Sequence, residues 1–309
     1  MTPAILIHGP TASGKTALGI ALANRLDGEI INADAMQVYG DLNVLTARPM
    51  AAELSAAPHH LFGHVDAGER HSAGRWVKDA SARIAELNGR EKVAIVVGGT
   101  GLYLQALVEG LSDIPTIPDA ARAKARGMVA DAAAGAYRRL AEVDPEGAAR
   151  VSEGDRQRVA RALEVWFATG RPLSSFRGEA EPALKAGAWV GVALTPPREA
   201  VYARIHARMD RMVAGGALKE AEALWARKLD RDLPAMRAHG MPGFCDHFDG
   251  RLGLEEALER CRRDTRRYAK RQLTWITHQF TKWPRIPAEA TDLRAKVTAA
   301  LWGEVKAGF

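Results

Sequence analysis

The amino-acid sequence predicts an α/β fold, in which helices cover both faces of a parallel sheet and a helical insertion separates two strands of that sheet. Two observations lead to this prediction. In the first part of the chain, short apolar runs alternate with segments of helical spacing, as they do in parallel sheets. After Leu111, a long Ala- and Arg-rich stretch contains no convincing strand, and one more apolar run follows it.

Apolar patterning and turn residues give the predicted elements in order. The run AILI reads as a buried strand that leads into Gly9, and VAIVV reads as another strand that Gly98 closes. The segment before VAIVV has helical spacing, with Trp76 and Ile84 on one face. We expect strands at residues 4–7, 29–33, 92–97 and 188–195, helices at about 16–26 and 72–88, and mostly helix from Arg198 onward.

The length of 309 residues corresponds to about two domains at roughly 150 residues each. We predict residues 1–112 as the first part of the core and residues 113–186 as a helical insertion. Residues 187–309 would complete the core with the last strand and C-terminal helices. Pro115 and Pro118 suit the linker that leads into the insertion.

Composition excludes several classes of protein. With 47% hydrophobic and 26% charged residues, the chain is neither disordered nor fibrous. No uncharged apolar run reaches the ~18 residues of a membrane span, and no secretion signal is visible. Cys245 and Cys261 lack zinc-type spacing, so we expect no structural zinc but buried thiols in the reducing cytoplasm. The net charge of +6 weakly indicates a polyanionic partner.

The segment GPTASGKT matches the pattern G-x-x-x-x-G-K-[ST] between a predicted strand and a predicted helix. Glycines let successive backbone N–H groups point at an anion, and the helix N-terminus adds positive charge. The lysine supplies an ammonium group, and the hydroxyl of the last residue can ligate Mg²⁺. The sequence therefore predicts a P-loop NTPase-like sheet that binds ATP or another pyrophosphate. The predicted phosphate-binding residues are Gly9, Pro10, Thr11, Ala12, Ser13, Gly14, Lys15 and Thr16.

The segment NADAMQVY follows the second predicted strand, where parallel sheets carry their chemistry. Asp34 should therefore lie near the P-loop, as a general base, an outer-shell Mg²⁺ partner or a helix N-cap. Gln37 either reads a base edge or is a solvated polar side chain. The run at 93–97 ends in glycines rather than in an aspartate, which disfavours an ordinary ATPase.

Seven segments in order resemble those of the tRNA dimethylallyltransferases, the isopentenyl-tRNA transferases, of bacterial type. Besides GPTASGKT and NADAMQVY, they are TARP from Thr46, HHLF from His59, GGTGLY from Gly98, DRQRVARALEV from Asp155 and YAKRQLTW from Tyr268. The resemblance implies transfer of a dimethylallyl group from dimethylallyl diphosphate to the exocyclic amine of the adenine just 3′ of the anticodon in tRNA. It also implies that the P-loop binds the diphosphate of the prenyl donor with Mg²⁺, and that the adenine is flipped into a channel. We expect a monomer without membrane contact.

The resemblance also assigns roles to individual residues. Asp34 would be the general base, with Ala35, Met36 and Gln37 lining the nucleotide site. Thr11 would approach the diphosphate, Lys15 would hold phosphate, and Thr16 would hold phosphate and metal. Arg204 would bind the leaving diphosphate, and Arg208, one helical turn later, is a weaker candidate for the same task. Thr100 would contact tRNA near the channel.

Several basic segments are candidates for tRNA contact. Residues 157–161 match a family segment that touches tRNA, and the run RRDTRRYAKR forms two stripes of cations on a helix. The first stripe is Arg262, Arg266 and Lys270, and the second is Arg263, Arg267 and Arg271. The predicted tRNA-binding residues here are Gln157, Arg158, Val159, Ala160, Arg161, Arg237, His239, Arg263 and Arg267. Met241-Pro242 stands where the family usually has Tyr and Arg, so contacts from that pair are in doubt.

Two other functions compete with the prenyl transfer. A P-loop small-molecule kinase would share the P-loop and an aspartate after the second strand, but it would not need the basic helices or the insertion. A non-enzymatic RNA-binding protein would leave the intact Lys15, Thr16 and Asp34 unexplained.

Overall fold

The computed structural model describes residues 2–176, 180–286 and 291–307, and the chain divides into two compact units. Unit 1 contains residues 1–108 and 183–309, and unit 2 contains residues 109–182. The predicted insertion, 113–186, begins and ends four residues later than unit 2. None of the described helices combines the length and apolar character that a membrane span requires.

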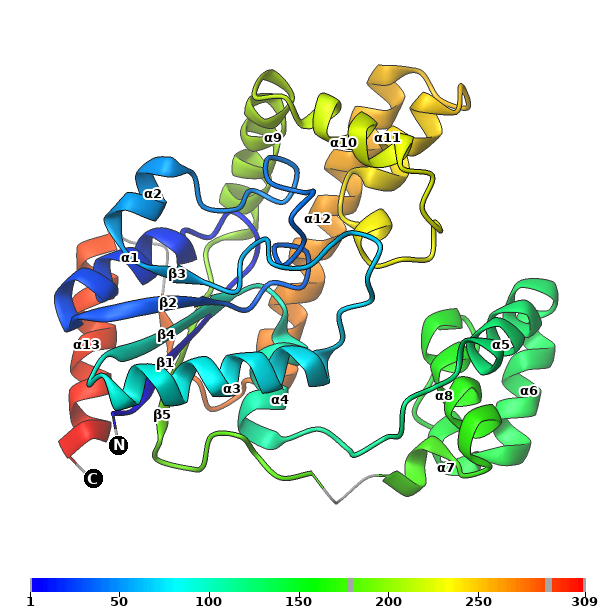
Figure 1. Ribbon diagram of the computed structural model, residues 1–309, viewed down its shortest axis with the longest axis horizontal. Helices are drawn as coiled ribbons and strands as arrows, with labels where there is room; N and C mark the ends of the chain where they lie inside the picture. Colours follow the sequence, from blue (N-terminus) through cyan, green and yellow to red (C-terminus); the bar gives the residue numbers. More distant parts are fainter. Residues whose placement is uncertain (1, 177–179, 287–290, 308–309) are drawn as a thin grey trace. The chain divides into compact units, whose positions relative to one another are not determined.

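Unit 1 is built on a parallel sheet (Figure 1). Its described strands are β1 (Ala4–His8), β2 (Gly28–Asn32), β3 (His59–His60), β4 (Val93–Gly98), β5 (Trp189–Leu194) and β6 (Arg285–Ile286). They lie in the order β3-β2-β4-β1-β5-β6. Every residue of β1 and β4 is buried, because helices cover both faces. The four strands expected from the sequence are present, and each of their ends lies within one residue of the expected position. The strands β3 and β6 have only two residues each, which is too short for an apolar pattern in the sequence, so they were not predicted.

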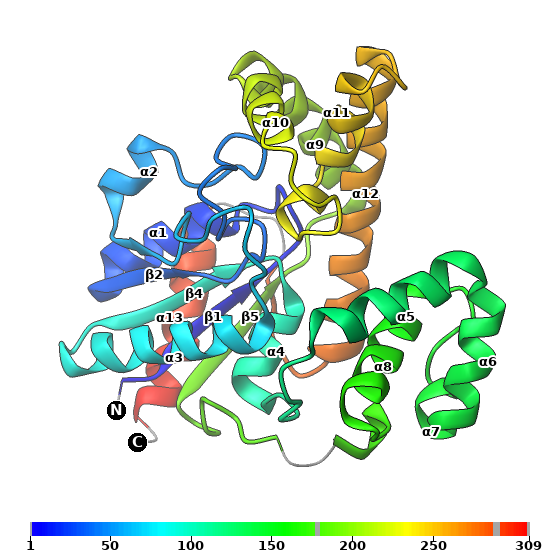
Figure 2. The same cartoon turned by 45° about the vertical axis from the view of Figure 1, so that its right-hand side comes forward.

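Alternate side chains of the central strands belong to different apolar clusters. Ile5 and Ile7 pack with Leu18 and Leu22 of α1 (Lys15–Leu26) and with Trp302 of α13 (Thr291–Ala307). Ala4 and Leu6 share the other cluster with α3 (Ala73–Gly89), α4 (Gly101–Glu109) and the end of α12 (Leu254–Gln279). Figure 2 shows α3 on the face of the sheet opposite α13.

A helical layer lies beyond the carboxyl ends of the strands. It contains α9 (Arg198–Ala214), α10 (Ala217–Ala226), α11 (Met241–Phe248) and the first half of α12, with the 3₁₀ turn η2 (Ala235–Arg237), whereas α2 (Ala51–Ala56) lies beside α1. Its apolar cluster includes Tyr39, Met209, Phe244 and Cys261. Since Tyr39 follows β2 in the chain, this cluster joins the helical layer to the segment that carries Asp34.

Unit 2 is a small helical bundle of α5 (Asp119–Asp131), α6 (Ala133–Val143), α7 (Pro145–Ala148) and α8 (Arg156–Thr169), with η1 (Leu173–Phe176). Its core contains Leu140 and Leu163. Asp144 is buried and accepts hydrogen bonds from Gly147 N at 2.8 Å and from Ser174 N at 3.0 Å. This carboxylate therefore ties the start of α7 to η1.

The close approach of β2 and β4 generates a testable prediction. A Cβ on Gly98 would lie 2.0 Å from the carbonyl oxygen of Ala33, the residue before Asp34. Gly98→Ala should therefore lower the free energy of unfolding by about 1–3 kcal/mol, as overpacking does, and displace the Asp34 segment. Chemical denaturation measures the change.

The matched control for Gly98→Ala is Gly89→Ala, at the end of α3. A Cβ on Gly89 meets nothing within 4 Å, so alanine there should be neutral or stabilise the helix by about 0.5–1 kcal/mol. Equal stability of the two variants would contradict the steric account.

Candidate active site

The P-loop curls between β1 and α1. Ala12 and Gly14 have positive φ values of 60° and 86°, and Ser13 N donates to Pro10 O at 3.2 Å. Gly9 is required sterically, because a Cβ there would lie 2.7 Å from the Ser13 Oγ. No acidic side chain occupies the first turn of α1, so the positive helix N-terminus is available to an anion.

Lys15 faces a cavity of about 580 Å³ that the P-loop lines together with Asp34 and Gln37. Its Nζ donates to Pro10 O at 3.3 Å. Burial, reinforced by Arg208, lowers the pKa of Lys15 to about 8, although Asp34 opposes this effect. Behind the loop, burial and the nearby Lys15 lower the pKa of His8 to about 3, so the His8 ring is neutral. An anion in the cavity would favour the charged form of Lys15.

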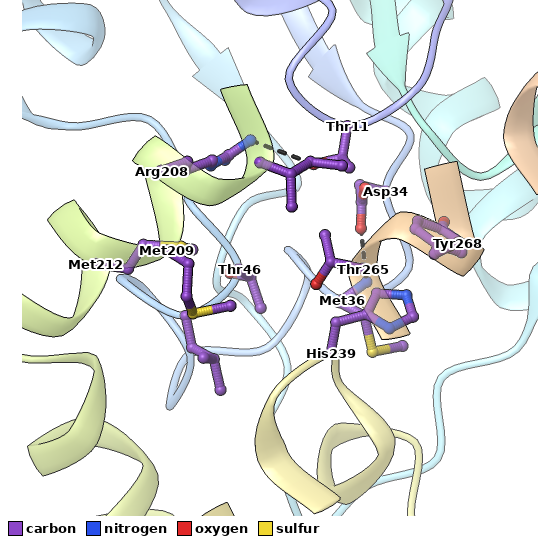
Figure 3. Close-up of a pocket in the computed structure, with 12 residues that line it drawn as sticks. Thr11, Asp34, Met36, Thr46, Arg208, Met209, Met212, His239, Thr265 and Tyr268 are labelled. Carbon is purple, nitrogen blue, oxygen red and sulfur yellow. Dashed lines mark hydrogen bonds between the residues drawn. The ribbon is translucent and has the colours of Figure 1, made fainter. Parts of the chain in front are cut away.

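Asp34 is held by its own segment. The Asn32 side chain accepts from Asp34 N at 2.8 Å and donates to Asp34 O at 3.0 Å. One carboxylate oxygen of Asp34 accepts from Met36 N at 3.0 Å (Figure 3). The residues after Asp34 form turns rather than a helix, so Asp34 caps a turn and not a helix. Asp34 also lines the larger cavity together with the P-loop, so it lies near the P-loop, as the sequence predicted.

Two neighbours of Asp34 also support the local backbone. Thr100 Oγ1 accepts from Ala35 N at 2.9 Å, so the glycine turn after β4 holds the segment after β2. Gln37 Nε2 donates to the carbonyl oxygens of Thr46 and Ala47, each at 2.9 Å. The Gln37 amide nitrogen is therefore engaged within the protein, while the side chain lines the larger cavity.

Thr11 connects the P-loop to two helices of the C-terminal part. Its backbone N donates to Gln272 Oε1 of α12 at 2.9 Å. Its Oγ1 accepts from Arg208 Nη1 of α9 at 3.3 Å (Figure 3). Gln272 is buried and donates to Gly99 O at 2.8 Å, so a single amide joins the P-loop to the glycine turn. Sequence reasoning missed Gln272, whose signal was its place inside the segment YAKRQLTW.

The structure places Arg208 deeper in the site than Arg204. Arg204 is exposed and donates to Ala12 O at 3.3 Å, on the rim of the larger cavity. Arg208 lines both cavities and bonds Thr11. Burial lowers the pKa of Arg208, and the charge of Asp34 opposes that shift. The preference for Arg204 over Arg208 is therefore not reflected in the geometry, because Arg208, one turn farther along α9, contacts Thr11 and lines both cavities.

A smaller cavity of about 70 Å³ adjoins Asp34 and Thr11. Its lining is largely apolar and is completed by Tyr268 and His239, whose ring centroids are 4.3 Å apart. Burial lowers the pKa of His239 and raises that of Tyr268, so both rings are neutral. The apolar lining residues are Met36, Leu45, Ile205, Met209 and Met212, of which the sequence analysis singled out only Met36.

The predicted tRNA-binding residues of α8 divide by exposure. Gln157 and Arg158 are exposed, and Arg161 is half-buried beside Glu164, 3.4 Å away. Val159 and Ala160 are 1% and 9% exposed inside the core of unit 2. The side chains of these last two residues hold the bundle together, so they offer almost no surface to RNA.

On α12, the two predicted cationic stripes have different surroundings. Arg262 pairs with Asp210 at 2.8 Å, and Arg266 pairs with Glu259 at 3.1 Å. Arg263 and Arg267 are exposed, with Asp264 3.6 Å from Arg267. The stripe that begins at Arg262 is thus largely neutralised by acidic neighbours, whereas the stripe of Arg263, Arg267 and Arg271 faces solvent.

Arg237 and His239 also differ in their surroundings. Arg237 is exposed and forms an ion pair with Asp232, whereas His239 lines the smaller cavity. Met241, at the departure from the family pattern, is fully buried and begins α11. It contributes to the core of the helical layer rather than to the surface.

Comparisons with known proteins show the family of this chain. The family model described as IPP transferase matches residues 37–279, and the one described as Isopentenyl transferase matches residues 2–61. A tRNA dimethylallyltransferase of Hyphomonas neptunium is 54% identical over 99% of this chain and 97% of its own length. Another, of Maricaulis maris, is 50% identical over 93% of each chain.

Solved structures give the same result. A full-length tRNA isopentenylpyrophosphate transferase from Bacillus halodurans superposes with a TM-score of 0.72 at 32% identity, covering 99% of this chain and 97% of that one. A eukaryotic dimethylallyltransferase acting on tRNA gives a TM-score of 0.79 at 29% identity, covering 94% and 75%. With a family model that spans most of its length and relatives at half identity, this chain belongs to the IPP transferase family, the tRNA dimethylallyltransferases.

Proposed function

We propose that this protein transfers the dimethylallyl group of dimethylallyl diphosphate to the exocyclic amine of the adenine just 3′ of the anticodon in tRNA. The observation that carries the proposal is that the P-loop, Asp34 and Arg208 line one continuous site. In the reaction, the bond from the adenine nitrogen to the allylic carbon forms and the carbon–oxygen bond breaks. Diphosphate leaves with the bonding electrons, and the nitrogen gives up a proton.

The P-loop face of the cavity suits the diphosphate. Backbone N–H groups at the start of α1, the Lys15 ammonium and the Arg208 guanidinium together offer positive charge and hydrogen-bond donors. Because these groups are fixed before the carbon–oxygen bond breaks, they stabilise the charge that develops on the leaving oxygen without reorganising. Thr11 is the P-loop residue that Arg208 contacts, and there it can approach the bridging oxygen of the diphosphate.

Asp34 suits the role of general base. The amine of adenine is a weak nucleophile because its lone pair is delocalised into the ring. A positioned carboxylate that receives the amine proton typically contributes ~10²–10⁴-fold to the rate. The hydrogen bond from Asp34 N to the Asn32 side chain and the one from Met36 N to the carboxylate fix the orientation of Asp34 and leave its carboxylate on the cavity wall.

The smaller cavity suits the prenyl chain. Its methionine and isoleucine side chains exclude water from the allylic carbon, which becomes more positive as the leaving group departs. The Tyr268 ring lines the same space, and an aromatic face attracts positive charge. Prenyl transfer therefore explains an apolar pocket beside a phosphate site.

The residues also fit a bound Mg²⁺. Thr16 lines the larger cavity beside Lys15, with Asp34 on the same wall. A hydroxyl, a carboxylate and substrate phosphate oxygens are the hard donors that Mg²⁺ takes, together with retained waters. Thr16 would hold the ion, which would supply Lewis-acid neutralisation of the diphosphate charge.

The tRNA would reach the site as a flipped nucleotide, since a stacked base cannot present its amine to a buried carbon. Exposed cations at Arg263 and Arg267 on α12, and Gln157 with Arg158 on α8, are the surfaces proposed to contact its backbone. We further propose that the protein acts as a monomer in the cytoplasm. Buried free thiols at Cys245 and Cys261 agree with a reducing compartment.

The experiment that tests this function is incubation with dimethylallyl diphosphate, Mg²⁺ and unmodified tRNA, followed by mass analysis of the nucleosides. Isopentenyladenosine next to the anticodon is expected. Product formed only when ATP replaces the prenyl donor would favour the kinase alternative instead.

Replacing the base gives the next prediction. Asp34→Asn keeps the size of the side chain but cannot take up a proton, so single-turnover transfer should slow by ~10²–10⁴-fold. The affinity for tRNA should stay within a few-fold. Asp27→Asn is the control, because Asp27 is 80% exposed at the far end of α1 and its left-handed backbone suits asparagine. Wild-type turnover in Asp34→Asn would reject the assignment of the base.

The lowered pKa of Lys15 predicts a pH dependence of donor binding. Dimethylallyl diphosphate should raise that pKa, so the complex holds one more proton than the free protein above about pH 8. The affinity of the protein for dimethylallyl diphosphate, measured calorimetrically without tRNA, should then fall by up to about tenfold per pH unit from about pH 8 upward. Lys15→Arg keeps its charge throughout this range and should bind with a flat profile. A wild-type profile as flat as that of Lys15→Arg would remove Lys15 from the phosphate site.

The two arginines of α9 can be separated experimentally. Arg208→Ala should reduce kcat/KM for the prenyl donor by ~10²–10³-fold, the usual effect of losing one fixed donor at a developing anion. Arg204→Ala, which removes an exposed contact to the rim, should have an effect of less than about tenfold. Steady-state kinetics of both variants shows which arginine contributes more. A larger loss of kcat/KM in Arg204→Ala than in Arg208→Ala would contradict the deeper position of Arg208 in the site.

A further inference from the structure

A cluster of two histidines and one aspartate lies apart from both cavities, where the loop after β3 meets α3. It consists of His64, His71 and Asp79, and one donor atom of each lies within 4.8 Å of the others. None of the three residues lines either cavity of the active site. The spacings of seven and eight residues along the chain fall outside the short patterns that identify metal sites in a sequence, so the cluster is visible only in three dimensions.

His71 has a buried nitrogen that the protein leaves unsatisfied. Its side chain is 1% exposed, and its Nε2 has no hydrogen-bond partner among the described residues. Asp79 Oδ2 lies 3.6 Å away, which is too long for a hydrogen bond. Because a buried polar atom without a partner costs about 1–3 kcal/mol, such an atom calls for an explanation.

The second nitrogen of His71 is engaged as in metal-bound histidines. His71 Nδ1 lies 3.4 Å from the Tyr103 hydroxyl. A ligating histidine usually engages its second nitrogen in this way, which orients the ring and presents the first nitrogen to the metal.

The two distances from Asp79 to the histidine nitrogens are close to those of a tetrahedral site. With bonds of about 2.0 Å to nitrogen and oxygen, tetrahedral ligand atoms lie about 3.3 Å apart. Here Asp79 Oδ2 is 3.6 Å from His71 Nε2 and 4.0 Å from His64 Nε2. The side chains of His64 and Asp79 are about one third exposed, at 32% and 33%, so they can move inward by the difference and water can reach a fourth position.

We propose that His64, His71 and Asp79 bind one divalent transition-metal ion, of which Zn²⁺ is the best match, with water as the fourth ligand. Two imidazoles and one carboxylate suit Zn²⁺, whereas Mg²⁺ prefers oxygen donors only. This inference revises the expectation of no structural zinc, which rested on spacing in the sequence.

The ion would fasten the 61–72 loop to α3. The same loop supports the segment after Asp34, because Gly63 N donates to Gln37 O at 2.9 Å and Val65 N donates to Val38 O at 3.0 Å. Metal binding should therefore stabilise the fold around the nucleotide side of the active site, without contact between the ion and the reacting atoms.

The test uses the full chain, without a histidine tag, after treatment with a chelator and removal of that chelator. Titration calorimetry with Zn²⁺ in excess Mg²⁺ should show one ion per chain, and Zn²⁺ should raise the melting temperature. Co²⁺ in place of Zn²⁺ should give the visible absorption of a four-coordinate site. These readouts do not involve prenyl transfer, so they stand or fall independently of the proposed function.

Variants assign the site to these residues. His64→Ala and Asp79→Asn, both at partly exposed positions, should weaken Zn²⁺ binding by at least about 100-fold, since loss of an outer partner alone costs about 10–100-fold. His278→Ala, which removes an exposed histidine from α12, should bind as the wild type does. His71→Ala is less informative, because removal of a buried side chain can also destabilise the fold. The proposal would be overturned if the wild type did not bind Zn²⁺, or if His64→Ala and Asp79→Asn bound Zn²⁺ as tightly as the wild type.

Discussion

The active site depends on how closely the ends of β2 and β4 approach each other. Gly98 leaves room for the backbone of Ala33, and Trp76 Nε1 donates to Asn32 O at 2.7 Å from the helix below. Asn32 in turn holds Asp34 through two hydrogen bonds. This contact places a carboxylate beside the P-loop, although the two segments come from different strands. A fixed carboxylate has the orientation that a general base needs before substrate arrives.

Charge balance in the site explains why it suits a diphosphate. Two cations, Lys15 and Arg208, are largely withdrawn from water, and burial lowers the pKa of each. The negative charge of Asp34 raises the pKa of both cations, but it offsets only part of the lowering that burial causes. The negative charges of a bound diphosphate would interact favourably with both cations, so binding of the donor would offset the free energy lost by burying them. The same arrangement then stabilises the diphosphate as it departs.

The C-terminal helices contribute more to the site than their distance in the chain suggests. From one helix, α12, Gln272 joins the P-loop to the glycine turn, Tyr268 lines the smaller cavity, and Arg263 and Arg267 face solvent. From α9 come Arg208 and two of the methionines that line the smaller cavity, Met209 and Met212. A single rigid helix can thus connect the catalytic pocket to a cationic surface, which agrees with an enzyme that acts on a small prenyl donor and a large nucleic acid.

The sequence by itself determined the sheet, the P-loop and the position of Asp34 after β2, because each depends on neighbours within a few residues. Apolar runs define buried strands, and a glycine-rich turn before a helix is a local arrangement. The tertiary structure decided that Arg208 rather than Arg204 faces the inner site, since Ile205 and Met209 pack inward and fix the rotation of α9. It also placed Gln272 between the P-loop and the glycine turn, brought His64, His71 and Asp79 together, and buried Val159 and Ala160. These features arise from packing between segments that are far apart in the chain. The periodicity of one helix shows which residues share a face, but it does not show which other segment packs against that face.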